Sequence, residues 1–176
     1  PDRAAHYLRR AANIWTTSHT HPHRELAKAH MLIAKLAMNE GDLVSAEHHA
    51  RLLAEIQASD LPAEHIDRGD PAYLLAIILA VQGEHERALE QARLALALWE
   101  PVYGPGSLVV QRLHSDVAAM LLALGRIDEA AEELDLLPPL LPGSPEEVSV
   151  RVRRCEIALR RGHLDDAKAE LRALEH

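Results

Sequence analysis

The chain contains no phenylalanine and only one cysteine among its 176 residues. A single cysteine excludes an internal disulfide framework and any zinc cage built from cysteines. Aromatic residues make up only 3% of the sequence, and no run approaches the roughly 18 apolar residues that a membrane span requires. The formal net charge is −8, whereas nucleic-acid binding normally needs a basic surface. We therefore expect neither a nucleic-acid partner nor membrane insertion.

The residues that are abundant favour helices. Alanine, leucine, glutamate and arginine dominate, and these residue types lose little side-chain freedom on a helix. Arginine outnumbers lysine 16 to 3, which we interpret as the codon bias of a GC-rich bacterial genome. No signal peptide is recognisable, and the expected location is the cytoplasm.

Glycine recurs at a spacing of 42 residues, at Gly41, Gly83 and Gly125. An alanine follows each glycine by five residues, and another small residue precedes it by seven. A fourth copy follows at a shorter step. The small residues are Ala34, Ala46, Ala76, Ala88, Ala118 and Ala130, with Cys155, Gly162 and Ala167 in the fourth copy. Self-similarity at this period is the signature of a helical solenoid, which offers an extended binding surface.

Each of these glycines separates two apolar stretches with helical spacing, so each copy predicts a helical hairpin. Connectors rich in proline and glycine separate the hairpins. The array begins with the second half of a repeat, so we expect a fragment of a longer protein. We predict a single array over 1–176, made of a half repeat at 1–20 and full repeats at 24–60, 70–104, 106–142 and 144–176.

Two local patterns predict specific contacts. Ser144 precedes Pro145 and stands three residues before Glu147, which is the pattern of a helix start with a capping box. The paired small residues predict close approach of the two helices within each hairpin.

These motifs resemble the tetratricopeptide repeat, and the step of 42 residues resembles its kinesin-light-chain-like subclass. The segments 4–11 and 96–105 are similar to that subclass's second helix and connector, and His21-Pro22-His23 matches its connector. The resemblance implies an all-α, right-handed superhelical solenoid of antiparallel helix pairs, with about nine helices. His85 departs from the family pattern, which places an apolar residue at this position.

The family's concave face maps to a stripe on the first helix of each hairpin. Residues three, four and seven apart share such a stripe. The resemblance therefore implies a peptide-binding site made of Lys28, Met31, Lys35, Asn39, Tyr73, Ile77, Arg112, Ser115, Ala119, Val152, Glu156 and Arg160.

Other residue groups suggest chemistry only weakly. His19, His21 and His23 have spacing that could hold a metal, but they lie in connector sequence. His48 and His49 are adjacent on a helix and diverge, as do His114, Ser115 and Asp116. Cys155 fills a small-residue position, which favours packing over reactivity. We expect no catalytic residue, no metal site and no cofactor.

Five arginines gather near the end of the chain: Arg151, Arg153, Arg154, Arg160 and Arg161. We interpret them as a solvated face that answers the acidic residues of the preceding helix, which are Asp128, Glu129, Glu132, Glu133 and Asp135. The alternative interpretation is a cationic end of the groove that holds an acidic peptide.

The sequence thus predicts a non-enzymatic protein–protein interaction scaffold that binds a peptide or a partner helix in the concave groove. The alternative is a regulatory or sensor repeat domain of a larger bacterial signalling protein, such as a kinase, a regulator ATPase or a protease. The truncated ends of the array also suggest self-association.

Overall fold

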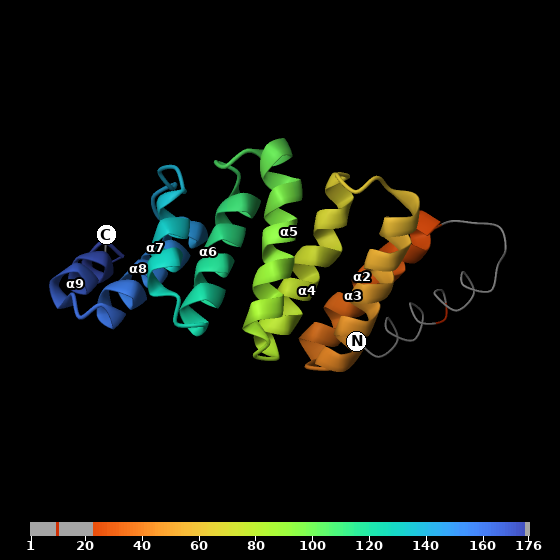
Figure 1. The fold of residues 1–176 in the computed structure, drawn as a ribbon, viewed down its shortest axis with the longest axis horizontal. Helices are drawn as coiled ribbons and strands as arrows, with labels where there is room; N and C mark the ends of the chain where they lie inside the picture. Colours follow the sequence, from red (N-terminus) through yellow and green to blue (C-terminus); the bar gives the residue numbers. More distant parts are fainter. Residues whose placement is uncertain (1–9, 11–22, 175–176) are drawn as a thin grey trace. The chain divides into compact units, whose positions relative to one another are not determined.

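The computed structural model describes residue 10 and residues 23–174, with side chains described from residue 24 apart from Arg10. These residues contain eight α-helices, one short 3-10 helix η1 (Ile66–Arg68) and no strand (Figure 1). The helices are α2 (His23–Glu40), α3 (Leu43–Asp60), α4 (Gly69–Val81), α5 (His85–Tyr103), α6 (Leu108–Ala123), α7 (Ile127–Asp135), α8 (Pro145–Arg160) and α9 (Leu164–Arg172). All eight helices of the four predicted hairpins are therefore present. The ninth, within 1–20, lies outside the described residues.

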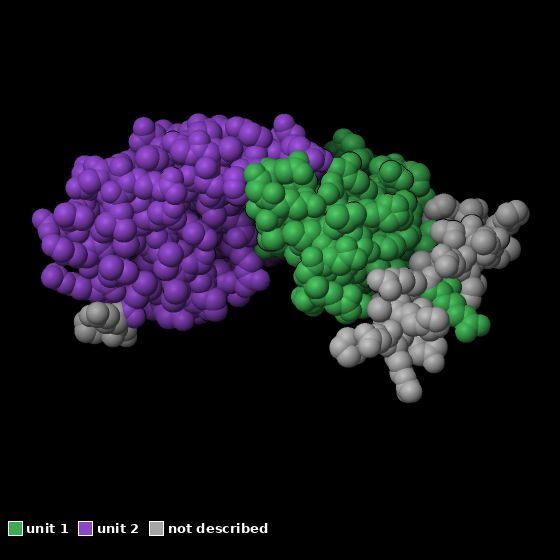
Figure 2. Space-filling view, turned by 90° about the horizontal axis from the view of Figure 1, so that it is seen from below, with its two compact units in different colours: residues 1–84 green, residues 85–176 purple. Residues whose placement is uncertain are grey.

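The chain forms two compact units, residues 1–84 and residues 85–176 (Figure 2). Unit 1 contains the hairpin α2–α3 together with α4. Unit 2 contains α5, the hairpin α6–α7 and the hairpin α8–α9. The boundary falls between the two helices of the predicted repeat 70–104, and the organisation as a single array stays a prediction.

The repeated glycines end the first helix of every hairpin. Gly41, Gly83, Gly125 and Gly162 have positive φ angles of 78°, 84°, 75° and 78°. Only glycine adopts this left-handed conformation without a steric penalty, which is why it is common just after a helix. In the first turn Asp42 N–H donates to Ala37 O at 2.9 Å and Gly41 N–H donates to Met38 O at 3.1 Å. The other three turns repeat this pair of hydrogen bonds, so one residue type sets all four turns.

The paired small residues are buried, as the pattern predicts. Ala34 and Ala46 are fully buried within the hairpin α2–α3, and Ala118 and Ala130 are fully buried within α6–α7. Cys155 and Ala167 form a buried cluster with Ala158 in α8–α9. Since no side chain longer than a methyl or thiol group stands at these positions, the two helices can pack closely. Cys155 is buried and acts as packing.

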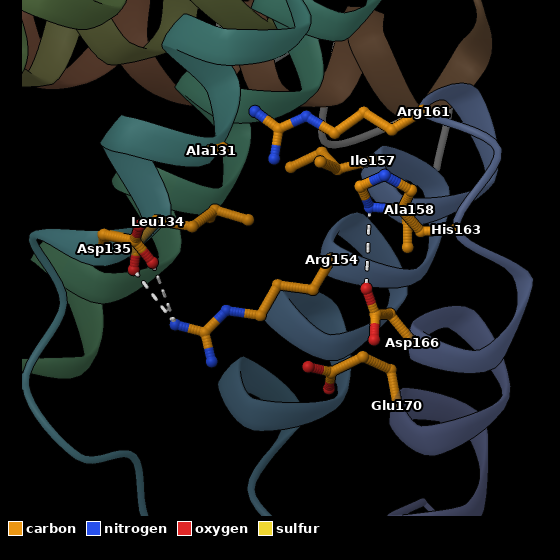
Figure 3. Close-up of a pocket in the computed structure, with 10 residues that line it drawn as sticks. All are labelled: Ala131, Leu134, Asp135, Arg154, Ile157, Ala158, Arg161, His163, Asp166 and Glu170. Carbon is orange, nitrogen blue, oxygen red and sulfur yellow. Dashed lines mark hydrogen bonds and ion pairs between the residues drawn. The ribbon is translucent and has the colours of Figure 1, made fainter.

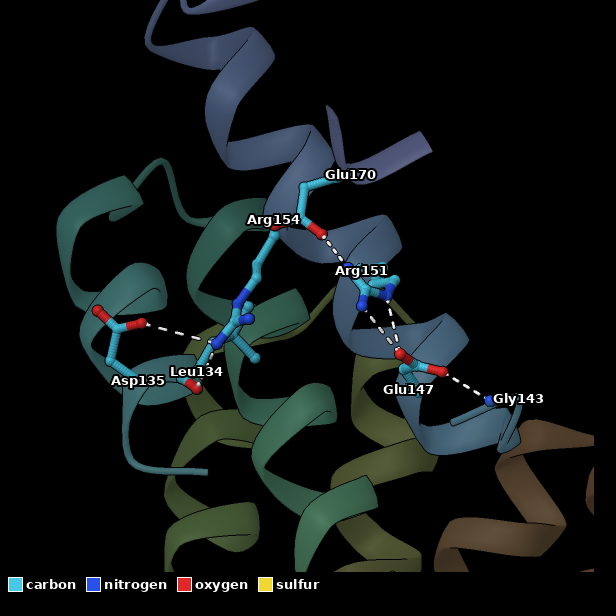
Figure 4. Close-up of polar contacts among 7 residues, drawn as sticks. All are labelled: Leu134, Asp135, Gly143, Glu147, Arg151, Arg154 and Glu170. Atoms are coloured by element: carbon cyan, nitrogen blue, oxygen red, sulfur yellow. Dashed lines mark hydrogen bonds and ion pairs between the residues drawn. The ribbon is translucent and has the colours of Figure 1, made fainter. Parts of the chain in front are cut away.

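The start of α8 confirms the predicted cap and modifies the box. Ser144 Oγ accepts a hydrogen bond from Glu147 N–H at 3.1 Å. The Glu147 carboxylate, however, accepts from Gly143 N–H at 2.7 Å rather than from Ser144 N–H. The reason is that Ser144 N–H already donates to Leu141 O at 3.1 Å. The hydrogen bond from Gly143, reinforced by Arg151, lowers the pKa of Glu147 (Figure 4).

Candidate functional site

In unit 1 the predicted binding stripe runs along α2 and continues onto α4. Lys28, Lys35 and Asn39 are exposed, while Met31 is partly exposed. Lys28 donates to Glu25 Oε1 at 2.9 Å on the helix surface, an ion pair that water screens strongly. On α4, Tyr73 and Ile77 are partly exposed. This part of the stripe therefore offers cations and apolar surface on the same face of α2.

Electrostatics link the two helices of this stripe. Burial, together with repulsion from Asp67, raises the pKa of Asp70 in the first turn of α4. Lys35 of α2 opposes that rise, so its ammonium group lies close enough to act on Asp70. The charge of Lys35 is therefore felt beyond its own helix.

In unit 2 the polar members of the stripe bind other parts of the same unit. Arg112 donates to the buried carboxylate of Glu146 at 2.9 Å, at the start of α8. The hydroxyl groups of Ser115 and Ser149 lie 2.7 Å apart. Ser115 is buried between α6 and α8. A ligand therefore cannot reach this hydroxyl without moving α8.

The remaining predicted residues on α6 and α8 differ in how far they are exposed. Arg160 bridges two groups of unit 2, because it donates to Glu156 Oε1 at 2.7 Å and to Leu122 O at 2.6 Å. Ala119 is partly exposed and Val152 is exposed. The structure therefore brings the unit 2 residues together as a contact between successive hairpins, with Val152 open to solvent.

The arginine cluster of α8 answers the preceding acidic helix, as predicted, but only in part. Arg161 donates to Asp128 Oδ1 at 2.6 Å, and Arg154 lies 3.8 Å from Asp135 Oδ1 (Figures 3 and 4). Arg151 instead donates to Glu147 and Glu170 at 2.9 Å and 3.0 Å, within its own hairpin (Figure 4). These ion pairs use much of the positive charge of the cluster.

A hollow of about 190 Å³ lies among α7, α8 and α9 (Figure 3). In Figure 3, Arg154 reaches towards Asp135, and Asp166 lies against His163, with Oδ2 and Nδ1 3.6 Å apart. Its charged groups therefore pair with one another, which is typical of a contact between helices. A larger hollow of about 390 Å³ lies in unit 1 and is lined by residues that include Arg24, Gln57 and His65. The Gln57 Oε1 atom in its wall is buried and has no hydrogen-bond partner among the described residues.

A polar bridge recurs between the two helices of three hairpins, always between residues 19 positions apart. It joins His30 to His49 at 2.9 Å, His114 to Glu133 at 2.6 Å and Arg151 to Glu170 at 3.0 Å. The second hairpin has Ala72 and Gln91 at the equivalent sequence positions. Sequence reasoning missed this bridge. The signal was present as polar residues at one register of successive repeats, four residues before the first small residue and three after the second.

His30 makes the bridge in unit 1 and is buried between α2 and α3. Its Nδ1 atom faces His49 Nδ1, so one ring must donate and the other must accept. The two rings stack with centroids 5.1 Å apart, and His48 meets His49 edge-on at 5.3 Å. Burial, and repulsion from His48, lower the pKa of His30 from its ordinary value of 6.5.

This lowered pKa predicts loss of stability in acid. Because the folded state holds His30 neutral, the unfolded chain binds more protons as the pH falls through about 6.5. The stabilisation is thus present above that pH and is lost below it. We expect His30→Leu to make the melting temperature less sensitive to pH between about 7 and about 5, the range in which histidine titrates. His163→Gln, at an exposed position, is the control, and an equal change in both variants would contradict the assignment.

The other chemical candidates are separated in the structure or lie outside its described part. His19 and His21 lie outside the described residues, as does the side chain of His23. His114 bonds to Glu133 and Ser115 to Ser149, so these neighbours do not form a base–nucleophile pair. Within the described part of the chain, no group of three or more His, Cys, Asp or Glu side chains is placed to hold a metal ion. No described helix is both long and apolar enough to cross a membrane.

The glycine turns, the buried small pairs and the helix order are the features of one repeat family. Residues 67–135 match the model of the tetratricopeptide repeat. The predicted resemblance to tetratricopeptide repeats is confirmed. Tetratricopeptide repeats are generally protein–protein interaction modules and typically non-enzymatic. No curated protein matches the chain significantly.

Solved structures extend the likeness over nearly the whole chain. Two crystal structures of kinesin light chain nearly identical TPR-like repeats from Podosopora anserina, one of them of a point variant, are similar to it. The point variant has a TM-score of 0.85 and 19% identity, covering 99% of this chain and 84% of that one. The other has a TM-score of 0.84 and 18% identity, covering 99% and 85%. BtubC (BKLC) from P. vanneervenii has a TM-score of 0.84 and 19% identity, covering 98% and 71%. The predicted fold class of antiparallel tetratricopeptide helix pairs is confirmed.

Proposed function

We propose that this protein is a scaffold that binds a peptide segment or partner helix of another protein along α2 and the start of α4. One observation supports the proposal: a single stripe of α2 combines the cations Lys28 and Lys35 with Met31, and α4 adds Tyr73 and Ile77. Helical repeat proteins use extended surfaces of this kind for binding. An acidic peptide with apolar residues would pair with the lysines and cover the apolar side chains.

The stripe residues of unit 2 are less suited to a primary contact. Arg112 and Arg160 already bond to Glu146 and Leu122, and Ser115 is buried. A ligand would have to break these hydrogen bonds before making its own. We therefore place the first contact on α2 and α4, and assign Ala119, Val152 and Glu156 to an extension of the same ligand.

The proposal predicts that Lys35→Glu weakens binding. The probe is a peptide selected on the purified protein from a randomised peptide library, and we expect the selected sequences to be acidic with apolar residues between. Charge reversal at Lys35 should weaken such a peptide by up to about tenfold, or ~1.4 kcal/mol, mainly by slowing association. The effect should shrink at high salt, because the Debye length falls from about 10 Å at 0.1 M salt to about 3 Å at 1 M.

Lys168→Glu is the matched control, because it is the same charge reversal on an exposed lysine of α9. Equal loss in both variants would locate the effect in overall charge rather than in the stripe. If no peptide is enriched and Lys35→Glu changes nothing, the proposal fails. The alternative of a regulatory domain that holds its own effector is then favoured. Arg112→Glu is a poor test, since it leaves Glu146 buried and facing a like charge.

A further inference from the structure

The last two hairpins are built alike but are not buried alike. Ala118, Gly125 and Ala130 recur as Cys155, Gly162 and Ala167, a step of 37 residues. At this step, four positions that are buried in α6–α7 become exposed in α8–α9. Gln111, Ser115, Leu122 and Leu134 are 4%, 1%, 1% and 1% exposed, whereas Val148, Val152, Leu159 and Leu171 are 43%, 44%, 52% and 51% exposed. We call these four exposed residues the end face.

Helix α8 is what covers the equivalent positions of α6–α7. The Ser149 hydroxyl lies 2.7 Å from that of Ser115, and Arg160 donates to Leu122 O at 2.6 Å. Arg154 donates to Leu134 O at 3.4 Å. Other core positions of α8–α9, such as Val150 and Ile157, stay buried. The end face therefore has the positions of a surface that a helix covers one hairpin earlier in the same chain.

The end face is also more apolar than the surface that it repeats. All four of its residues are aliphatic, whereas Gln111 and Ser115 of the preceding hairpin are polar. A terminal repeat that faces water normally carries a polar outer face. Exposed aliphatic groups gathered on one face are typical of an interaction site. The hairpin α8–α9 thus lacks the character of a cap.

We propose that the end face docks a second copy of this chain, with the end face of one protomer packed on the end face of its partner. Such a pairing is two-fold symmetric, and an apolar patch is complementary to itself. The charges allow it: residues 145–172 carry seven Lys and Arg against six Asp and Glu, although the whole chain has a net charge of −8. Two copies that meet here bring together almost no net charge, and their mixed ion-pairing groups can face one another.

Sedimentation of the full chain over a range of concentrations tests this proposal. The mass should rise from the 19.5 kDa of the monomer towards twice that value as the concentration increases. Leu159→Glu and Leu171→Glu should each keep the protein monomeric, since each buries a charge against apolar groups in the dimer. Val44→Glu is the matched control and should leave the dimer intact, because Val44 is 79% exposed on α3, outside the end face.

Either of two results overturns the proposal: a wild-type chain that stays monomeric throughout, or a dimer that survives both end-face variants. Circular dichroism checks that the variants are folded, and Leu159→Ser offers a milder change at the same position. The result is separate from the proposed peptide binding. A monomeric Leu159→Glu protein should still bind the selected peptide through Lys35, so failure of one proposal does not carry over to the other.

Discussion

Ala88→Phe is expected to lower the free energy of unfolding by about 3 kcal/mol, in the upper part of the range for overpacking. Ala88 is fully buried on α5, at the position that Ala46, Ala130 and Ala167 occupy in the other hairpins. A phenyl ring has no space there, so helices must move apart or side chains must leave their preferred rotamers. Urea unfolding monitored by circular dichroism measures the loss.

Ala97→Phe is the control for this prediction. Ala97 lies on the same helix but is exposed, so the ring can extend into water. We expect a change within about 0.5 kcal/mol, as for most surface substitutions. Equal losses in the two variants would show that the register assigned to α5 is wrong.

The second large effect concerns the bridge between α6 and α7. His114 is buried, and its Nδ1 lies 2.6 Å from Glu133 Oε1, while its Nε2 lies 3.9 Å from Glu100 Oε1. His114→Leu leaves the largely buried Glu133 carboxylate without this partner and away from water. Loss of a hydrogen bond to a charged group typically costs about 1.5–3 kcal/mol, and we expect about 2–3 kcal/mol here. The measurement is again the free energy of unfolding.

A double-mutant cycle separates the bridge from simple packing changes. Combining His114→Leu with Glu133→Leu removes both polar groups, so the double variant should lose less than the sum of the two single losses. Asp128→Ala breaks the exposed pair with Arg161 and should cost less than about 1 kcal/mol. Additive losses at His114 and Glu133 would mean that the bridge contributes little.

The turns and the small-residue contacts were predictable because their causes are local. A positive φ angle selects glycine from the conformation of one residue, and Gly41 meets that need in the same way as Gly162. Paired alanines such as Ala34 and Ala46 follow from the distance between two helices joined by a short turn. These requirements recur in every copy, so the period of the sequence exposes them.

The polar contacts were predictable only in part. Arg161 and Asp128 pair as the charge pattern suggested, but Glu133, assigned to the same acidic face, turns inward to His114. Composition shows that opposite charges lie on neighbouring helices. It does not show which carboxylate points to solvent and which into the hairpin, because that depends on the rotation of each helix about its axis.

The sequence by itself determined the helical hairpins, their turns and the family that they resemble, since each rests on residue types at fixed local spacing. The tertiary structure alone decided which predicted site residues are accessible. Ser115 and Val152 occupy the same register, yet one is buried beneath α8 and the other is exposed. Burial of a residue in a repeat protein depends on the neighbouring hairpin that covers it, and contacts 34 residues apart, such as Ser115 with Ser149, are not written in either helix alone.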